Sequence, residues 1–176
     1  MTTPRARIRR RVAPVAVGVL AVLLAAGPAH AGNGGVGPGT VDDQVVTTTQ
    51  QQGRVVALTF DDGPDPVKTP ALLDVLREHH VEATFCLWAD HVRQYPDLVR
   101  RIAAEGHTLC NHTMTHADLS TWTPEQVRAD PQATSDLIHS IVPKEQIPYF
   151  RAPYGAWRQG AAVAAELGMQ PLGWPG

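Results

Sequence analysis

Hydrophobic and polar residues follow two repeating patterns along this chain, one typical of strands and the other typical of helices. Short apolar or β-branched runs predict strands at residues 54–60, 81–88, 107–112, 147–155 and 169–174. Apolar residues three or four positions apart predict helices at residues 69–80, 96–106 and 159–168, and a further helix that begins at Thr123. Because strands and helices alternate, we expect an α/β architecture with parallel strands and right-handed crossovers.

The helix that begins at Thr123 carries two conflicting signals. Its first residues, "TPEQ", match a capping box with proline at the first helical position. Pro131 follows about two turns later, where a proline removes one backbone hydrogen bond and clashes with the carbonyl of Val127. We therefore expect the helix either to kink at Pro131 or to end there and restart.

The first 31 residues predict a secretory signal peptide. Arginines cluster between residues 5 and 11, an apolar run follows at residues 12–26, and small residues occupy positions 29 and 31. A membrane anchor is the alternative, but the run is shorter than the roughly 20 residues that span a bilayer. We expect cleavage after Ala31, export to the extracellular space and no stable membrane anchor.

The mature chain is acidic and begins with a polar stretch. Residues 32–53 contain many glycines and no large apolar side chain, which predicts a flexible linker before a domain at residues 54–176. Removing residues 1–31 leaves 10 of the 15 Lys and Arg residues against all 17 Asp and Glu residues, so the net charge falls from −2 to −7. Such a charge argues against nucleic acid as a partner, since phosphates attract clustered basic residues.

Two cysteines, Cys86 and Cys110, occur in the predicted domain. They are either two buried thiols or a disulfide. We expect a disulfide, because both lie in predicted strands that follow one another along the chain and export favours oxidation.

Polar side chains gather at the ends of three predicted strands. They are Asp61 and Asp62 after the first strand, His112 and His116 after the third, and Arg151 and Tyr154 at the end of the fourth. In parallel α/β folds the carboxyl ends of the strands form the functional site. We therefore expect these side chains to share one site.

The residue types in these clusters point to a metal and a base. Two histidines four residues apart on one helical turn reach a single ion, although this spacing alone is a weak signal. Adjacent aspartates repel each other unless a cation or an arginine compensates. One carboxylate would bind the metal, while the other, held by Arg151, would act as general base for a metal-bound water. A turn or helix cap is the alternative for one aspartate, and an iron oxygenase uses the same ligand types.

Three motifs occur in an order and spacing that resemble a known family. They are "TFDDGP" at residues 59–64, "NHTMTH" at residues 111–116 and "RAPYG" at residues 151–155. From residue 54 to its end the chain resembles the polysaccharide deacetylases, the NodB-homology or carbohydrate esterase family 4 hydrolases. The resemblance implies a distorted (β/α) barrel. It also implies metal-dependent removal of acetyl groups from N-acetylglucosamine polymers such as chitin oligosaccharides or peptidoglycan, or from acetylated xylan.

The resemblance also implies a role for each site residue. The implied ligands of a divalent metal ion, usually zinc and sometimes cobalt, are Asp62, His112 and His116. Asp61 would be the general base, and Arg151 would be its partner. The backbone N–H of Tyr154 would stabilise the oxyanion.

The family pattern continues beyond what this sequence contains. A later aspartate–tryptophan motif, a histidine that acts as general acid and the last strand–helix units of the barrel are missing after "PLGWPG". We therefore expect a C-terminally truncated, monomeric member that protonates the leaving amine poorly. Two alternatives stay open: an O-acetyl esterase acting on xylan, and a glycan-binding fragment impaired in catalysis.

Overall fold

The computed structural model of this chain describes residues 41–49 and 53–175. The predicted signal peptide at residues 1–31 lies outside the described residues, as do linker residues 32–40 and 50–52. None of the helices in the described ranges combines the length and the hydrophobicity that a transmembrane span requires.

Five parallel strands form one sheet in the described part of the chain, in the order β1-β2-β3-β4-β5. The strands are β1 (Thr59–Gly63), β2 (Thr84–Leu87), β3 (Thr108–Asn111), β4 (Tyr149–Phe150) and β5 (Gln170–Pro171). Each strand pairs with the next strand along the chain, and helical segments lie between consecutive strands. The predicted α/β fold with parallel strands is therefore confirmed.

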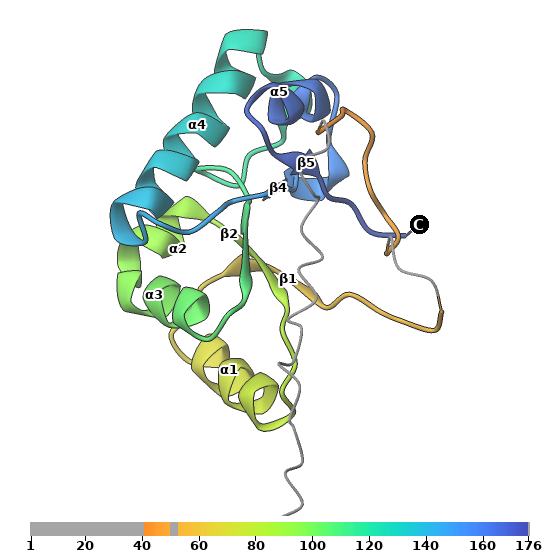
Figure 1. The fold of residues 1–176 in the computed structure, drawn as a ribbon. Coiled ribbons are helices and arrows are strands. Elements are labelled where there is room, and N and C mark those ends of the chain that lie inside the picture. The colour runs from red at the N-terminus through yellow and green to blue at the C-terminus, as the bar shows by residue number, and fades with distance from the viewer. Residues whose placement is uncertain (1–40, 50–52, 176) are drawn as a thin grey trace, which may run out of the picture. The chain divides into compact units, whose positions relative to one another are not determined.

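Five α-helices connect the strands. They are α1 (Lys68–Glu78), α2 (Ala89–Gln94), α3 (Pro96–Ala104), α4 (Pro124–Ile141) and α5 (Gly160–Glu166). Figure 1 shows α2, α3 and α4 together on one side of the strands. The sequence pattern missed α2, because a helix of six residues is too short to establish a helical period.

Helix α4 begins with the predicted capping box. The Thr123 hydroxyl accepts a hydrogen bond from the Gln126 backbone N–H at 3.4 Å, and the Thr123 N–H donates to the Gln126 side chain at 2.9 Å. The helix then runs without a break through Pro131 to Ile141. Of the two outcomes expected at Pro131, the helix does not end and restart, because burial of its inner face, including Val127, holds both halves against the sheet.

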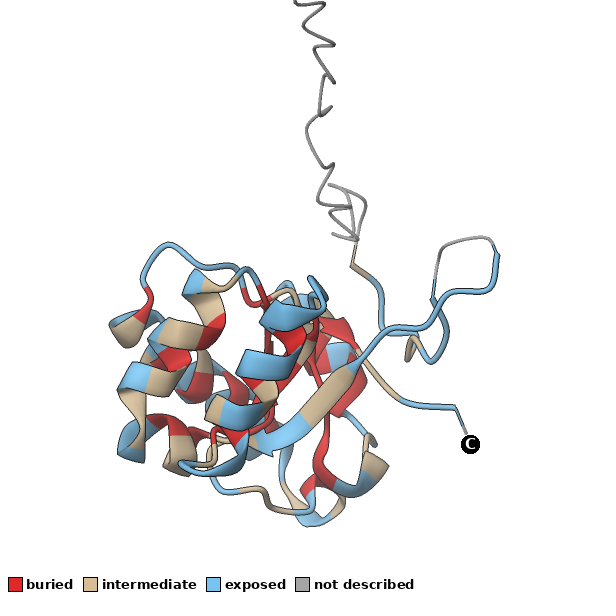
Figure 2. Ribbon diagram, turned by 90° about the horizontal axis from the view of Figure 1, so that it is seen from below, coloured by how far each residue is buried: buried red, intermediate tan, exposed pale blue. Residues whose placement is uncertain are grey.

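The hydrophobic core lies between the sheet and the helices. Its buried members include Leu73, Phe85, Leu87, Val99, Ile102, Leu109 and Ile138. In Figure 2 the buried residues lie on β2 to β5 and on the inner helix faces, whereas β1 and the outer helix faces are intermediate or exposed. Burial of each large side chain contributes about 1.5–3 kcal/mol. This core fixes the positions of the strand ends that carry the polar clusters.

Cys86 and Cys110 form the predicted disulfide. They are register partners on the neighbouring strands β2 and β3, and both are fully buried. Adjacent positions in a parallel pair bring the two Cα atoms to 4.1 Å from each other. The bond joins β2 to β3 just before the loop that contains His112.

Part of the predicted linker lies along the sheet. Val46 forms a parallel bridge with Leu172, and the Gln170 side-chain amide donates to the carbonyl of Gln44 at 2.7 Å. Within the predicted linker, Val46 is therefore paired with the sheet. The physical reason is that the strand edge at β5 presents backbone N–H and C=O groups that an extended segment can pair with.

Candidate active site

Asp61 and Asp62 lie within β1 and not after it. The strand ends at Gly63, later than predicted, and its pairing with β2 is irregular between Phe60 and Gly63. Asp62 has a φ of 66°, in the left-handed region that residues other than glycine seldom adopt. In a regular strand two successive side chains point to opposite faces. Because the backbone is irregular here, the two carboxylates lie at the same site and point in different directions.

His112 and His116 lie in an irregular loop that follows β3. The expectation of a helical turn here is wrong, because Thr113 and His116 have φ values of 70° and 56°. Two local hydrogen bonds hold this shape. The Thr113 N–H donates to the Asn111 side chain at 3.0 Å, and the His116 N–H donates to the Thr113 hydroxyl at 3.0 Å. The loop, and not a helical period, brings the two imidazoles together.

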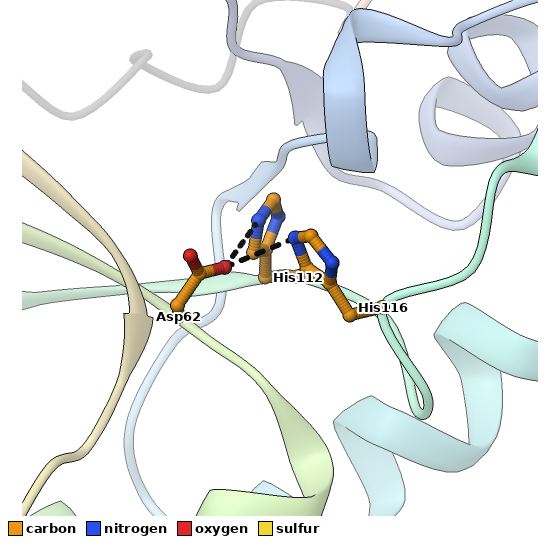
Figure 3. Close-up of side chains that lie close together, drawn as sticks. All are labelled: Asp62, His112 and His116. Atoms are coloured by element: carbon orange, nitrogen blue, oxygen red, sulfur yellow. Dashed lines mark ion pairs between the residues drawn. The ribbon is translucent and has the colours of Figure 1, made fainter.

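Asp62, His112 and His116 form a group with the geometry of a metal site. Asp62 Oδ1 lies 3.3 Å from His112 Nε2 and 3.0 Å from His116 Nε2 (Figure 3). The three potential ligand atoms all lie within 4.8 Å of one another. A tetrahedral zinc ion with bonds of about 2.0 Å separates its ligand atoms by about 3.3 Å. The three side chains therefore fit one ion of this kind.

His112 is held in the form that binds metals. Its ring is buried, and its Nδ1–H donates to the backbone carbonyl of Arg151 at 2.7 Å. Because the carbonyl only accepts, the proton is on Nδ1, and the Nε2 lone pair faces Asp62. Burial lowers the pKa of His112, which favours the neutral imidazole.

Arg151 is buried and joins Asp61 to the far strands of the sheet. Its Nη1 donates to Asp61 Oδ1 at 2.6 Å and to the Thr59 hydroxyl at 2.9 Å. Its Nε donates to the carbonyl of Leu172 at 3.0 Å, and its Nη2 donates to the carbonyl of Gly173 at 3.2 Å. The guanidinium is thus fixed from two sides, and it orients the Asp61 carboxylate while balancing its charge.

Tyr154 lies beside the histidines at the end of the fourth predicted strand. Its φ of 60° places it in a left-handed turn, and the residue is 70% exposed. The Tyr154 hydroxyl is 3.2 Å from His116 Nδ1. The structure therefore brings all six predicted site residues to one place.

Two further residues border the site and escaped the sequence analysis. His91 Nδ1 donates to the backbone carbonyl of Asp62 at 2.6 Å. The Trp88 ring centroid lies 4.4 Å from that of His91 and 5.6 Å from that of His116. Trp88 is the first residue after β2, so the rule that functional groups follow strand ends applies to it as well.

Comparison with known proteins identifies the family. The model of the family described as polysaccharide deacetylase matches residues 48–172. A chitooligosaccharide deacetylase of Bradyrhizobium sp. (strain ANU 289) is 46% identical over 122 residues, which are 69% of this chain and 56% of that protein. A peptidoglycan-N-acetylglucosamine deacetylase of Bacillus cereus is 41% identical over 103 residues, 57% of this chain and 36% of that protein.

A solved structure shares the fold and covers a similar part of the chain. The family 4 carbohydrate esterase from Streptomyces lividans, in complex with acetate, has a TM-score of 0.60 and 31% identity, covering 65% of this chain and 59% of that one. The chain thus spans about half the length of the first curated relatives that it matches. Since the family model matches more than half of the chain, this protein belongs to the polysaccharide deacetylase family.

Proposed function

We propose that this chain carries the metal site and the general base of a secreted hydrolase that removes acetyl groups from N-acetylglucosamine polymers. The division of labour between two adjacent carboxylates is the observation that carries this proposal. Asp62 faces both histidines, whereas Asp61 is paired with Arg151. A site that only binds an ion has no use for the second carboxylate, but hydrolysis needs a base beside the ion.

Each side chain has a separate task in this proposal. The ligands of a divalent ion, zinc or alternatively cobalt, are Asp62, His112 and His116. When bound, such an ion polarises the acetyl carbonyl and lowers the pKa of water at the site. Asp61 accepts the proton of the attacking water, and Arg151 holds the Asp61 carboxylate in place. The backbone N–H of Tyr154 stabilises the negative charge that develops on the acetyl oxygen.

The relatives support an acetylated glycan as substrate. The Bradyrhizobium relative is named for chitooligosaccharide, and the Bacillus cereus relative is named for peptidoglycan N-acetylglucosamine. The Streptomyces lividans esterase structure contains acetate. The predicted signal peptide supports action outside the cell, where such polymers occur. We therefore place chitin oligosaccharides and peptidoglycan first and acetylated xylan second.

Acetate release from these three substrates, measured with added zinc or cobalt, tests the proposal. We expect release from the N-acetylated glycans and a loss of about 100-fold or more in Asp61→Asn, because that variant removes the base. Zinc affinity should not change in Asp61→Asn. Asp136→Asn removes the same charge from an exposed position of α4 and serves as the control.

Two results would replace the proposal with another one. Release from acetylated xylan alone would assign an O-acetyl esterase. Binding of the glycans without any acetate release would assign a glycan-binding protein.

A further inference from the structure

The loop that carries the two histidines adopts a costly backbone conformation. Thr113 and His116 both have positive φ values, which carry a steric cost for residues with a side chain. Such a conformation persists only when surrounding contacts determine it. The contacts that hold this loop therefore decide where the two imidazoles point.

Helix α4 supplies part of these contacts from outside the site. At the start of the loop, the Asn111 side-chain amide donates to the Pro131 carbonyl at 2.7 Å and to the Ser135 hydroxyl at 2.9 Å. In the middle of the loop, the Met114 backbone N–H donates to Asp130 Oδ1 at 2.8 Å. Asp130 thus binds the loop halfway between the two histidines.

Burying the Asp130 carboxylate lowers the stability of the fold, so a purely structural role does not explain why an aspartate is present here. It is 8% exposed, and within the described residues Met114 provides the one hydrogen bond found to its carboxylate. Burial raises its pKa to about 6, since a single N–H only partly replaces the lost water. A buried carboxylate with one donor costs stability, whereas an apolar residue at this position would pack without that cost.

We propose that Asp130 is a positioning residue for the metal centre: its buried carboxylate holds the backbone N–H of Met114 and thereby fixes the separation of His112 and His116. The inference rests on the proposed metal site. It assigns no contact between Asp130 and the ion or the substrate. Outer-shell groups of this kind set ligand geometry, and their loss costs metal affinity.

Zinc affinity of the full chain, measured by competition with a chromophoric chelator, tests the proposal without using catalysis. Asp130→Ala removes the acceptor and should weaken zinc binding by about 10- to 100-fold. Asp130→Asn keeps an oxygen acceptor at the same place and should bind zinc as the unmodified chain does. Unchanged affinity in Asp130→Ala, or an equal loss in both variants, would overturn the hydrogen-bonding role.

Two control variants separate positioning from charge and from stability. Asp136→Ala removes a carboxylate from an exposed position of the same helix, and Ile138→Val weakens the packing of the buried face of α4. Both should bind zinc normally. A loss of affinity in Ile138→Val equal to that in Asp130→Ala would show that general weakening of α4 explains the result.

Amide hydrogen exchange in metal-free protein distinguishes failure of this inference from failure of the proposed function. Asp130→Ala should speed exchange at Met114 and its neighbours by tenfold or more relative to the strands, while Asp130→Asn should not. If the unmodified chain binds no zinc, the metal site is wrong, and the exchange comparison still decides whether Asp130 holds the loop. Unchanged exchange in Asp130→Ala would overturn the inference.

Discussion

The two sides of the candidate active site are built in different ways. The histidine side extends from β3, a central strand, and His112 is buried and hydrogen-bonded to a carbonyl. The aspartate side lies on β1, at the edge of the described sheet, and the Asp62 side chain is 60% exposed. The buried core fixes His112, whereas the Asp62 carboxylate lies at the surface, although its neighbour Asp61 is held by the buried Arg151.

This difference indicates how the site can combine fixed ligand directions with access from solvent. The buried side sets the direction of the Nε2 lone pairs before an ion arrives, which reduces the ordering cost of binding. The exposed side leaves the Asp62 carboxylate accessible, as the polymeric substrate of the proposed function requires. Contacts such as that between His91 and the Asp62 carbonyl hold the exposed side.

The largest contrast is expected between His112→Ala and Asp62→Ala. Both variants should lose zinc affinity by more than about 100-fold, because removing a ligand costs more than an outer-shell change. Only His112→Ala should also lower the free energy of unfolding, by about 2 kcal/mol, since the Arg151 carbonyl loses its buried donor. Urea unfolding and zinc titration of both variants measure this. Equal stability losses would contradict the comparison.

Removing the disulfide should destabilise β2 and β3, which the bond joins, and with them the folded chain. We expect the double variant Cys86→Ala/Cys110→Ala to lose about 3 kcal/mol of stability, as is typical for a loop of this length. Val56→Ala, at an 85% exposed position before β1, should change stability by less than about 0.5 kcal/mol. Thermal unfolding with and without reductant provides the measurement. The expectation would be contradicted if the unmodified chain had the same melting temperature with and without reductant.

Asp65, which follows β1, and Asp130, on α4, should contribute to stability with opposite pH dependences. Backbone hydrogen bonds from Lys68 and Val67 lower the pKa of Asp65, so its stabilisation is present above its ordinary pKa and is lost as pH falls. The pKa of Asp130 is raised to about 6, so its relative stabilisation is present at low pH and is lost as pH rises through about 6.

Unfolding free energies of Asp65→Asn and Asp130→Asn between pH 4 and 8 test these signs. Above pH 6, Asp130→Asn should be more stable than the unmodified chain, on the order of up to 3 kcal/mol. Asp65→Asn should be less stable than the unmodified chain in the same range. The difference for Asp130→Asn should shrink toward pH 4, whereas the difference for Asp65→Asn should persist at pH 4, because the pKa of Asp65 is lowered from an ordinary value of 3.8. A common sign for the two variants would contradict the assignment.

The smallest effect is expected at an ion pair remote from both sides. Arg100 and Asp97 are 2.6 Å apart on α3, with side chains that are 54% and 96% exposed. Asp97→Asn should change stability by less than about 0.5 kcal/mol, because exposed ion pairs gain little in water. The same urea assay gives this value and sets the scale for the larger effects.

Local sequence signals determined much of the fold and nearly all of the candidate site. Strand-like and helix-like hydrophobic patterns alternate along the chain, and this alternation predicted the parallel α/β fold. The "TPEQ" capping box predicted the start of α4. Asp61, Asp62 and the two histidines were recognisable because their residue types follow apolar runs at fixed spacing. Such signals are local, so they survive without knowledge of distant contacts.

Tertiary contacts alone decided the features that local rules disfavour. The left-handed backbone at Asp62, Thr113 and His116 is unfavourable for the isolated chain, and it persists because the surrounding structure holds it. The role of Asp130 was invisible for the same reason, because its partner Met114 lies 16 residues away in the sequence. The sequence by itself specified which groups the site contains, and packing against α4 and the sheet decided how they face one another.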